Sequence, residues 1–151
     1  MINSINHFSF TVSNLEKSVK FYQTLLGLRL IDLSERDRAF SEKVTGIKSA
    51  HLNIAYLSGH NCSIELIQYL SPVGKKLDTA SSNVGASHIC FNVTNFMDFH
   101  ARLKKAGVHF IGEPQKIPSG PNKGRLVIYL KDPDSNTLEF ISVEVQMEES
   151  F

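Results

Sequence analysis

The alternation of apolar and polar residues predicts a short strand near the start of the chain and a helix directly after it. Across residues 5–12, Phe8 and its apolar neighbours fall on one face, whereas His7 and small polar residues fall on the other. Ser13 follows, with Glu16 three residues later, which is the pattern of a capping box at the start of a helix. Apolar positions then recur at helical spacing, at Leu15, Val19, Tyr22 and Leu26.

This order of elements occurs twice in the chain. The string His7-Phe-Ser-Phe-Thr-Val-Ser-Asn-Leu returns at His88 as His-Ile-Cys-Phe-Asn-Val-Thr-Asn-Phe. Thr94 or Asn95 is the expected cap of the second helix, whose apolar stripe is Phe96, Phe99, Leu103 and Ala106. A glycine ends each helix, Gly27 in the first half and Gly107 in the second.

The strands that close the two halves also correspond. Tyr56-Leu57 and Tyr129-Leu130 occupy matching positions in the first strand of a hairpin. The second strand of each hairpin has one carboxylate among apolar residues, Glu65 or Glu139. Each half therefore has the pattern β-α-β-β-β.

A single half could not cover both faces of its sheet, so we expect the two halves to form one α+β domain over residues 1–151. Module one spans about residues 3–70 and module two about residues 86–143. The two pseudo-symmetric modules are expected to form an open, cup-shaped mixed sheet with the helices on the outside.

Polar segments separate these elements. Residues 34–46 are charged and fit either a loop or a short helix, and residues 71–85 have the composition of a linker. Residues 112–124 contain prolines and glycines and are expected to form a long loop. Residues 132–136 have the composition of a tight hairpin turn, and the acidic tail from Glu144 is expected to fray.

Strand alternation also predicts where the polar groups of the repeat point. Because the apolar face of each strand must pack on a helix, His7, Glu65, His88 and Glu139 all point to the opposite, concave side. A carboxylate within an apolar strand is costly to bury without a partner, and one divalent cation could serve as the partner of all four groups. Imidazole and carboxylate ligands without a thiolate suit Zn, Ni, Co, Mn or Fe(II).

Simpler interpretations remain open for each residue alone. A single histidine on a half-buried strand is usually just a satisfied polar residue, and a strand glutamate can pair with a nearby Lys or Arg. The four histidines without repeat partners are expected at the surface or at sheet edges: His51, His60, His100 and His109. Cys90 is expected to be a small buried thiol, and Cys62 lies in a polar loop.

Composition excludes several classes of function. The chain of 151 residues is 42% hydrophobic and 21% charged, as in ordinary globular proteins. A formal net charge of +1 gives no argument for a nucleic acid or an anionic membrane as partner. The chain contains no apolar run of the ~20 residues that a bilayer requires. The N-terminus lacks the features of a signal peptide, so a cytoplasmic protein with a small-molecule substrate is expected.

At the repeated histidine and glutamate positions the chain resembles the vicinal oxygen chelate superfamily. This superfamily includes glyoxalase I, methylmalonyl-CoA epimerase, extradiol dioxygenases and the fosfomycin and bleomycin resistance proteins. The most specific stretches are Lys20-Phe-Tyr-Gln-Thr-Leu-Leu-Gly-Leu, Ser87-His-Ile-Cys-Phe and Gly124-Arg-Leu-Val-Ile-Tyr-Leu-Lys-Asp-Pro-Asp-Ser-Asn-Thr-Leu-Glu-Phe. The resemblance implies paired βαβββ modules around a metal, often in a homodimer. It also implies that the ligands are His7, Glu65, His88 and Glu139.

The chain departs from members of this family at a few positions. Ser135 stands where the tight turn usually has glycine, which implies a small backbone cost. Thr11 stands where glutathione-dependent glyoxalases typically have an arginine for the carboxylate of the thiol conjugate. Methylmalonyl-CoA epimerases usually have a segment other than Asp132-Pro-Asp before the last glutamate.

Three classes of function are compatible with this pattern. The first is a metal-dependent isomerase or lyase, in which Glu139 and Glu65 move a proton α to a carbonyl. The second is an Fe(II) extradiol-type dioxygenase, although a fourth protein ligand at Glu65 would crowd the face that oxygen needs. The third is a resistance-type protein that binds a ligand without catalysis, for which the ligand set is unnecessary. The candidate substrate-binding residues are Ser9, Thr11, Asn92, Lys116, Lys123 and Arg125.

Overall fold

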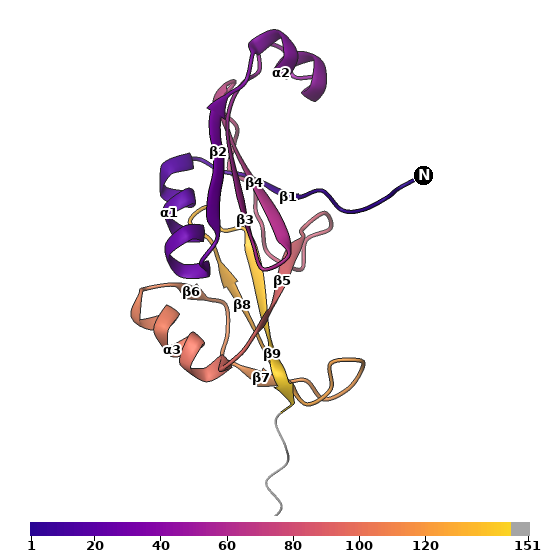
Figure 1. Cartoon of the computed structure of the whole chain (residues 1–151), viewed down its shortest axis with the longest axis vertical. Coiled ribbons are helices and arrows are strands. Elements are labelled where there is room, and N and C mark those ends of the chain that lie inside the picture. The colour runs from indigo at the N-terminus through magenta and orange to yellow at the C-terminus, as the bar shows by residue number, and fades with distance from the viewer. Residues whose placement is uncertain (146–151) are drawn as a thin grey trace, which may run out of the picture. The chain divides into compact units, whose positions relative to one another are not determined.

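The computed structural model describes residues 1–145 and divides the chain into two compact units, Met1–Leu77 and Asp78–Phe151. Each unit begins with a strand, a helix and a second strand, and each ends with a hairpin (Figure 1). The predicted α+β fold with two βαβββ modules and mixed sheets is therefore confirmed. None of the helices in the described part of the chain is long and apolar enough to cross a membrane.

The first unit contains a four-stranded sheet in the order β1-β4-β3-β2. Its elements are β1 (Phe8–Thr11), α1 (Leu15–Leu26), β2 (Arg29–Glu35), α2 (Arg38–Thr45), β3 (His51–Gly59) and β4 (Cys62–Ser71). Strands β1 and β4 pair in parallel, whereas the β2–β3 and β3–β4 pairs are antiparallel. Leu57, Ile64 and Leu66 are fully buried, so one face of this sheet forms a core with α1 (Figure 1).

Helix α1 begins one residue later than the capping-box pattern predicts. Asn14, not Ser13, is the N-cap, and its side-chain oxygen accepts a hydrogen bond from the backbone N–H of Lys17. Gly27 ends the helix in the left-handed conformation, with φ of 71°. The imidazole Nε2 of His60 lies 2.9 Å from the carbonyl oxygen of Leu26 in the last turn, so His60 supplies a C-terminal contact for this helix.

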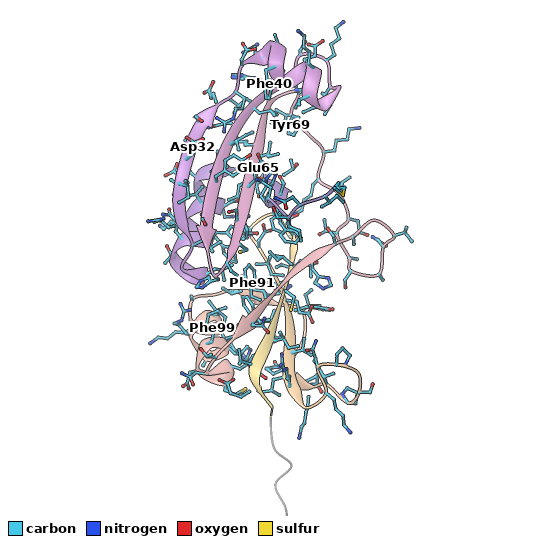
Figure 2. The ribbon with its side chains drawn as sticks, turned by 45° about the vertical axis from the view of Figure 1, so that its right-hand side comes forward. Asp32, Phe40, Glu65, Tyr69, Phe91 and Phe99 are labelled. Carbon is cyan, nitrogen blue, oxygen red and sulfur yellow. The ribbon has the colours of Figure 1, made fainter. Side chains whose placement is uncertain are left out.

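The charged segment that was compatible with a loop or a short helix contains a helix. Asp37 caps α2 by accepting a hydrogen bond from the N–H of Phe40, and Gly46 ends it with φ of 70°. Helix α2 connects β2 to β3 at one end of the first sheet (Figure 1). Phe40, labelled in Figure 2, is 56% exposed.

The second unit contains a sheet in the order β5-β9-β8-β6, and β7 also pairs with β8. Its elements are β5 (His88–Val93), α3 (Phe96–Lys105), β6 (His109–Phe110), β7 (Gln115–Lys116), β8 (Arg125–Lys131) and β9 (Thr137–Val145). Strands β5 and β9 are parallel, and β8 is antiparallel to β9. Helix α3 packs on the sheet through Phe99, whose ring centroid lies 4.9 Å from that of Phe140. The short strand β7 occupies part of the segment predicted to be a long loop.

The tight turn of the second unit is organised by one carboxylate. Asp132 accepts hydrogen bonds from the backbone N–H groups of Asp134 and Asn136, at 2.9 and 2.8 Å. Its second oxygen accepts from the Asn136 side-chain amide at 2.9 Å. Ser135 has φ of 71°, so the position does require the conformation that favours glycine.

Three expectations about single residues in the second unit were wrong. His100 is 8% exposed, with its ring 4.6 Å from that of Phe110, because the buried stripe of α3 is Phe96, His100 and Leu103. Cys90 is exposed because it shares the polar strand face of His88 and does not belong to the core. Glu144 and Val145 belong to β9, and residues 146–151 of the predicted frayed tail lie outside the described residues.

Candidate metal and substrate site

The first candidate pair joins His7 and Glu65 in the first unit. Ile64 and Leu66 flank Glu65 on β4 and are fully buried, which directs the carboxylate to the other face of the sheet. The side chain of Glu65 is only 10% exposed, and its Oε2 lies 3.3 Å from His7 Nε2. His7 precedes β1 by one residue, and its Nδ1 lies 2.7 Å from the side-chain oxygen of Asn6. Figure 2 shows Glu65 in the middle of this sheet.

The second unit contains the equivalent pair, His88 and Glu139. Leu138 and Phe140 flank Glu139 on β9 and are buried, as their counterparts are in the first unit. Glu139 Oε2 lies 2.9 Å from His88 Nε2, with the side chains 16% and 38% exposed respectively. Strand alternation therefore directs Glu65 and Glu139 away from their buried neighbours, and each carboxylate lies beside the histidine of its own unit.

A tyrosine lies beside each pair, although the sequence pattern did not predict either tyrosine as a site residue. Tyr56 on β3 lies directly opposite Glu65, and Tyr129 on β8 lies directly opposite Glu139. The ring of Tyr56 makes an edge contact with His7, with the centroids 5.6 Å apart. The ring centroids of Tyr129 and His88 are 5.2 Å apart. The repeat did contain this information, because the two tyrosines stand at matching positions of the strands that pair with the glutamate strands.

Three groups near these carboxylates have raised pKa values. The hydroxyl of Tyr56 donates a hydrogen bond to Glu65 Oε1, which together with burial raises the pKa of Tyr56 to about 12. Burial and the Glu139 charge raise the pKa of Tyr129. Burial, followed by the charge of Glu139 and a hydrogen bond to it, raises the pKa of the Cys90 thiol to about 12. Both carboxylates therefore lie in environments where a neighbouring negative charge is unfavourable.

The donor atoms of each pair are suitably spaced to hold a metal ion. Two adjacent ligands at ~2.0–2.2 Å from one ion are separated by roughly 3.0–3.5 Å, depending on the coordination geometry. The nitrogen–oxygen distances of 3.3 and 2.9 Å in the two pairs are close to this range. Within residues 1–145 the structure has no group of three or more His, Cys, Asp or Glu placed to hold a metal. The ligands are thus gathered as pairs, and their union into a set of four stays a prediction.

The candidate substrate-binding residues divide into two groups. Ser9, Thr11 and Asn92 are exposed and lie at alternate positions from His7 and His88, on the same strand faces as the ligand candidates; on β5 the alternation is with buried or half-buried residues, whereas on β1 Phe8 is also exposed. Strand alternation does not align the basic residues with the ligand candidates. Lys116 lies on β7 and Lys123 in the loop after it, and a register shift after Arg125 interrupts the alternation that leads to Tyr129.

Comparison with known proteins identifies the family of this chain. The family model "Glyoxalase/Bleomycin resistance protein/Dioxygenase superfamily" matches residues 4–140. The crystal structure of a glyoxalase family protein from Bacillus cereus has the same fold, with a TM-score of 0.81 at 20% identity over 94% of this chain and 95% of that chain.

Curated relatives with assigned activities are enzymes. A 2-epi-5-epi-valiolone epimerase from Actinomyces is 27% identical over 93% of this chain and 79% of its own length. The metallothiol transferase FosB of Shouchella clausii is 29% identical over 92% and 80%, respectively. A lactoylglutathione lyase from Haemophilus influenzae is 26% identical over 91% and 90%. Taken with the repeated modules, the family match shows that the chain belongs to the glyoxalase, bleomycin resistance protein and dioxygenase superfamily.

Proposed function

We propose that this protein is a metal-dependent isomerase or lyase that removes a proton α to a carbonyl group of a small-molecule substrate. The observation that carries the proposal is the repeated His–Glu pair, His7 with Glu65 and His88 with Glu139, at 3.3 and 2.9 Å. Each pair lies beside a tyrosine at the matching position of the neighbouring strand, so both modules offer an imidazole and a carboxylate together.

In this proposal the four residues hold one divalent ion, with Zn, Ni, Co or Mn suited to the nitrogen and oxygen donors. Such an ion, when bound, polarises a substrate carbonyl as a Lewis acid and so acidifies the adjacent C–H group. The pairs supply two imidazoles and two carboxylates. This set has more protein ligands than the two-histidine, one-carboxylate site of Fe(II) oxygenases, which favours proton transfer over oxygen chemistry.

The chain's carboxylates supply the acid–base chemistry. Glu139 accepts the proton from the carbon next to the carbonyl, which leaves an enolate, and a carboxylic acid then returns the proton to carbon or oxygen. Glu65, at the equivalent position in the other unit, is the second group able to take or return a proton. Ser9, Thr11 and Asn92 are proposed to line the site, and Lys123 and Arg125 to bind an anionic group of the substrate.

The relatives support this class of reaction while differing in substrate. One relative is named an epimerase and another a lactoylglutathione lyase, so an epimerase and a lyase are both among them. The family also includes bleomycin resistance proteins and dioxygenases, so an Fe(II) dioxygenase and a non-catalytic resistance-type binding protein are the alternatives. We also propose a homodimer, because the edge strands of both sheets leave backbone groups available for pairing.

Solvent-deuterium exchange tests the proposal directly. Protein loaded with Zn, Ni, Co or Mn in turn is incubated in D₂O with 2-oxo thiohemiacetals, acyl-CoA thioesters and cyclic polyol ketones, and deuterium at the α carbon is followed by NMR. Glu139→Gln should reduce the exchange rate at least ~10²-fold, because a positioned general base contributes about that much. Glu113→Gln is the control, since Glu113 is exposed and its ion partner is Lys104. Equal exchange in wild type and Glu139→Gln would refute the mechanism, and activity restricted to oxygen-sensitive iron would favour the dioxygenase.

A further inference from the structure

Tyr56 links the candidate ligand Glu65 to the rest of the first sheet. Its hydroxyl donates a hydrogen bond to Glu65 Oε1, while the other carboxylate oxygen, Oε2, lies 3.3 Å from His7 Nε2. The ring of Tyr56 also makes an edge contact with His7, at an interplanar angle of 84°. One side chain therefore contacts both members of the first pair and leaves neither oxygen of Glu65 without a neighbour.

A second carboxylate lies on the other side of Tyr56. Asp32 on β2 is also directly opposite Tyr56 and carries a second carboxylate in the same row (Figure 2). The Asp32 oxygen already accepts hydrogen bonds from the Ser34 hydroxyl and the Arg36 guanidinium, at 2.9 and 3.1 Å. The Tyr56 hydroxyl donates to Glu65 and not to Asp32.

The second unit lacks this arrangement. Tyr129 occupies the matching place opposite Glu139, but among residues 1–145 no hydrogen bond joins its hydroxyl to that carboxylate. The residue directly opposite Glu139 on β5 is Cys90, whose thiol is a weaker donor than a phenol. The two carboxylates therefore occupy equivalent positions, but within the described part of the chain only Glu65 is held by a hydrogen bond from a tyrosine hydroxyl.

We propose that Tyr56 is a positioning residue that fixes Glu65 as a metal-holding carboxylate, whereas the less restrained Glu139 is the carboxylate that moves the substrate proton. This inference rests on the proposed function and assigns different roles to its two glutamates. The physical reason is that a ligand already held in its binding rotamer loses less conformational freedom when it binds an ion. Hydrogen-bonded partners of metal ligands typically contribute 10–100-fold to metal affinity.

The test compares Tyr56→Phe with the matched variant Tyr129→Phe, which removes the equivalent hydroxyl from the second unit. Zn²⁺ or Co²⁺ is titrated into metal-free protein in competition with a chromophoric chelator. Tyr56→Phe should bind the ion about 10–100-fold more weakly than wild type, and Tyr129→Phe should differ from wild type by less than about threefold. Equal affinities for wild type and Tyr56→Phe, or an equal loss in both variants, would overturn the inference.

A second measurement does not depend on a bound metal. In metal-free protein, the Tyr56 hydroxyl proton should give an NMR resonance protected from exchange. This resonance should be absent in Tyr56→Phe and in Glu65→Ala, which removes the acceptor oxygens, and retained in Tyr129→Phe. Absence of that resonance from wild type would overturn the positioning role. If wild type shows the resonance but binds no divalent ion, the proposed function fails and the metal-holding role of Glu65 fails with it. If wild type binds the ion and Tyr56→Phe binds it equally well, only the inference about Tyr56 fails.

Discussion

Glu139 and His88 meet across a pair of parallel strands, with Oε2 of the carboxylate 2.9 Å from Nε2 of the imidazole. The residue directly opposite Glu139 on β5 is Cys90, two positions after His88, so alternation brings its thiol to the same carboxylate. Because of this proximity, the rate at which the Cys90 thiol is alkylated should depend on the charge of Glu139.

We expect the Cys90 thiol to react slowly although the residue is exposed. Burial of the sulfur and the Glu139 charge raise its pKa to about 12, compared with an ordinary value of 9.0. At pH 8 the thiolate fraction falls from about 10% to on the order of 10⁻⁴, so alkylation should be roughly 10³-fold slower than in unfolded protein. The measurement uses iodoacetamide on the metal-free Cys62→Ser variant, in which Cys90 is the one remaining cysteine. Glu139→Gln should accelerate the reaction, and equal rates in folded and unfolded protein would contradict this account.

The acid stability of the first unit should depend on Asp32. Hydrogen bonds from Ser34 and Arg36 lower the pKa of this carboxyl below its ordinary value of 3.8. Because the folded-state pKa lies below the unfolded value, the stabilisation is fully present above pH 3.8 and is lost as pH falls through the folded pKa. Asp32→Asn should therefore lower the melting temperature at pH 7 and have no effect at the most acidic pH at which the protein folds. A difference that stays constant over this pH range would contradict the assignment.

The turn of the second unit should be strengthened by restoring glycine. Ser135 adopts φ of 71°, and the backbone bonds of this residue, from its N–H to the Asp132 carbonyl and from the Thr79 hydroxyl to its own carbonyl, do not need its side chain. Ser135→Gly should raise the free energy of unfolding by about 1 kcal/mol. Ser135→Ala is the matched control, because it removes the hydroxyl but keeps the Cβ; it should give no such gain in urea denaturation.

Helix α3 should contribute to stability through its buried stripe and not through its outer face. Leu103 is fully buried, whereas Met97 on the same helix is 55% exposed. Leu103→Ala should cost about 2–5 kcal/mol of unfolding free energy, because it removes buried methyl groups and leaves a cavity. Met97→Ala should change it by less than about 0.5 kcal/mol. Similar losses from both substitutions, measured by chemical denaturation, would mean that the helix packs differently.

The fold was predictable because two patterns, the alternation of apolar residues in strands and their helical spacing, each occur twice in the chain. Alternation placed Glu65 and Glu139 opposite their buried neighbours, and the structure confirms this for each strand. Prediction was less accurate where two neighbouring residues can each take the same role, such as a helix cap or a buried position. Asn14 replaced Ser13 as the helix cap, and His100 joined the buried side of α3, where Phe99 still packs on Phe140. A helical period of 3.6 residues permits both positions to face the sheet.

The candidate site was predictable as residue types but not as contacts. The repeat identified His7 and His88 together with their glutamates, whereas the hydrogen bond from Tyr56 depends on the pairing register of β3 with β4. Register is fixed by the turn between those strands, and the sequence pattern does not specify it to one residue. Cys90 was expected in the core because of its apolar neighbours, although it lies two residues after His88 and alternation within β5 places both on one face.

The most direct test of the central claim is the stoichiometry of metal binding to purified, metal-free protein, measured by calorimetry with Zn²⁺ or Co²⁺. A single ion held jointly by all four residues requires one ion per chain, and both His7→Ala and His88→Ala should weaken the same binding event by at least about 100-fold. Two independent ions per chain, or a His88→Ala variant that binds its ion as tightly as wild type, would contradict a shared site.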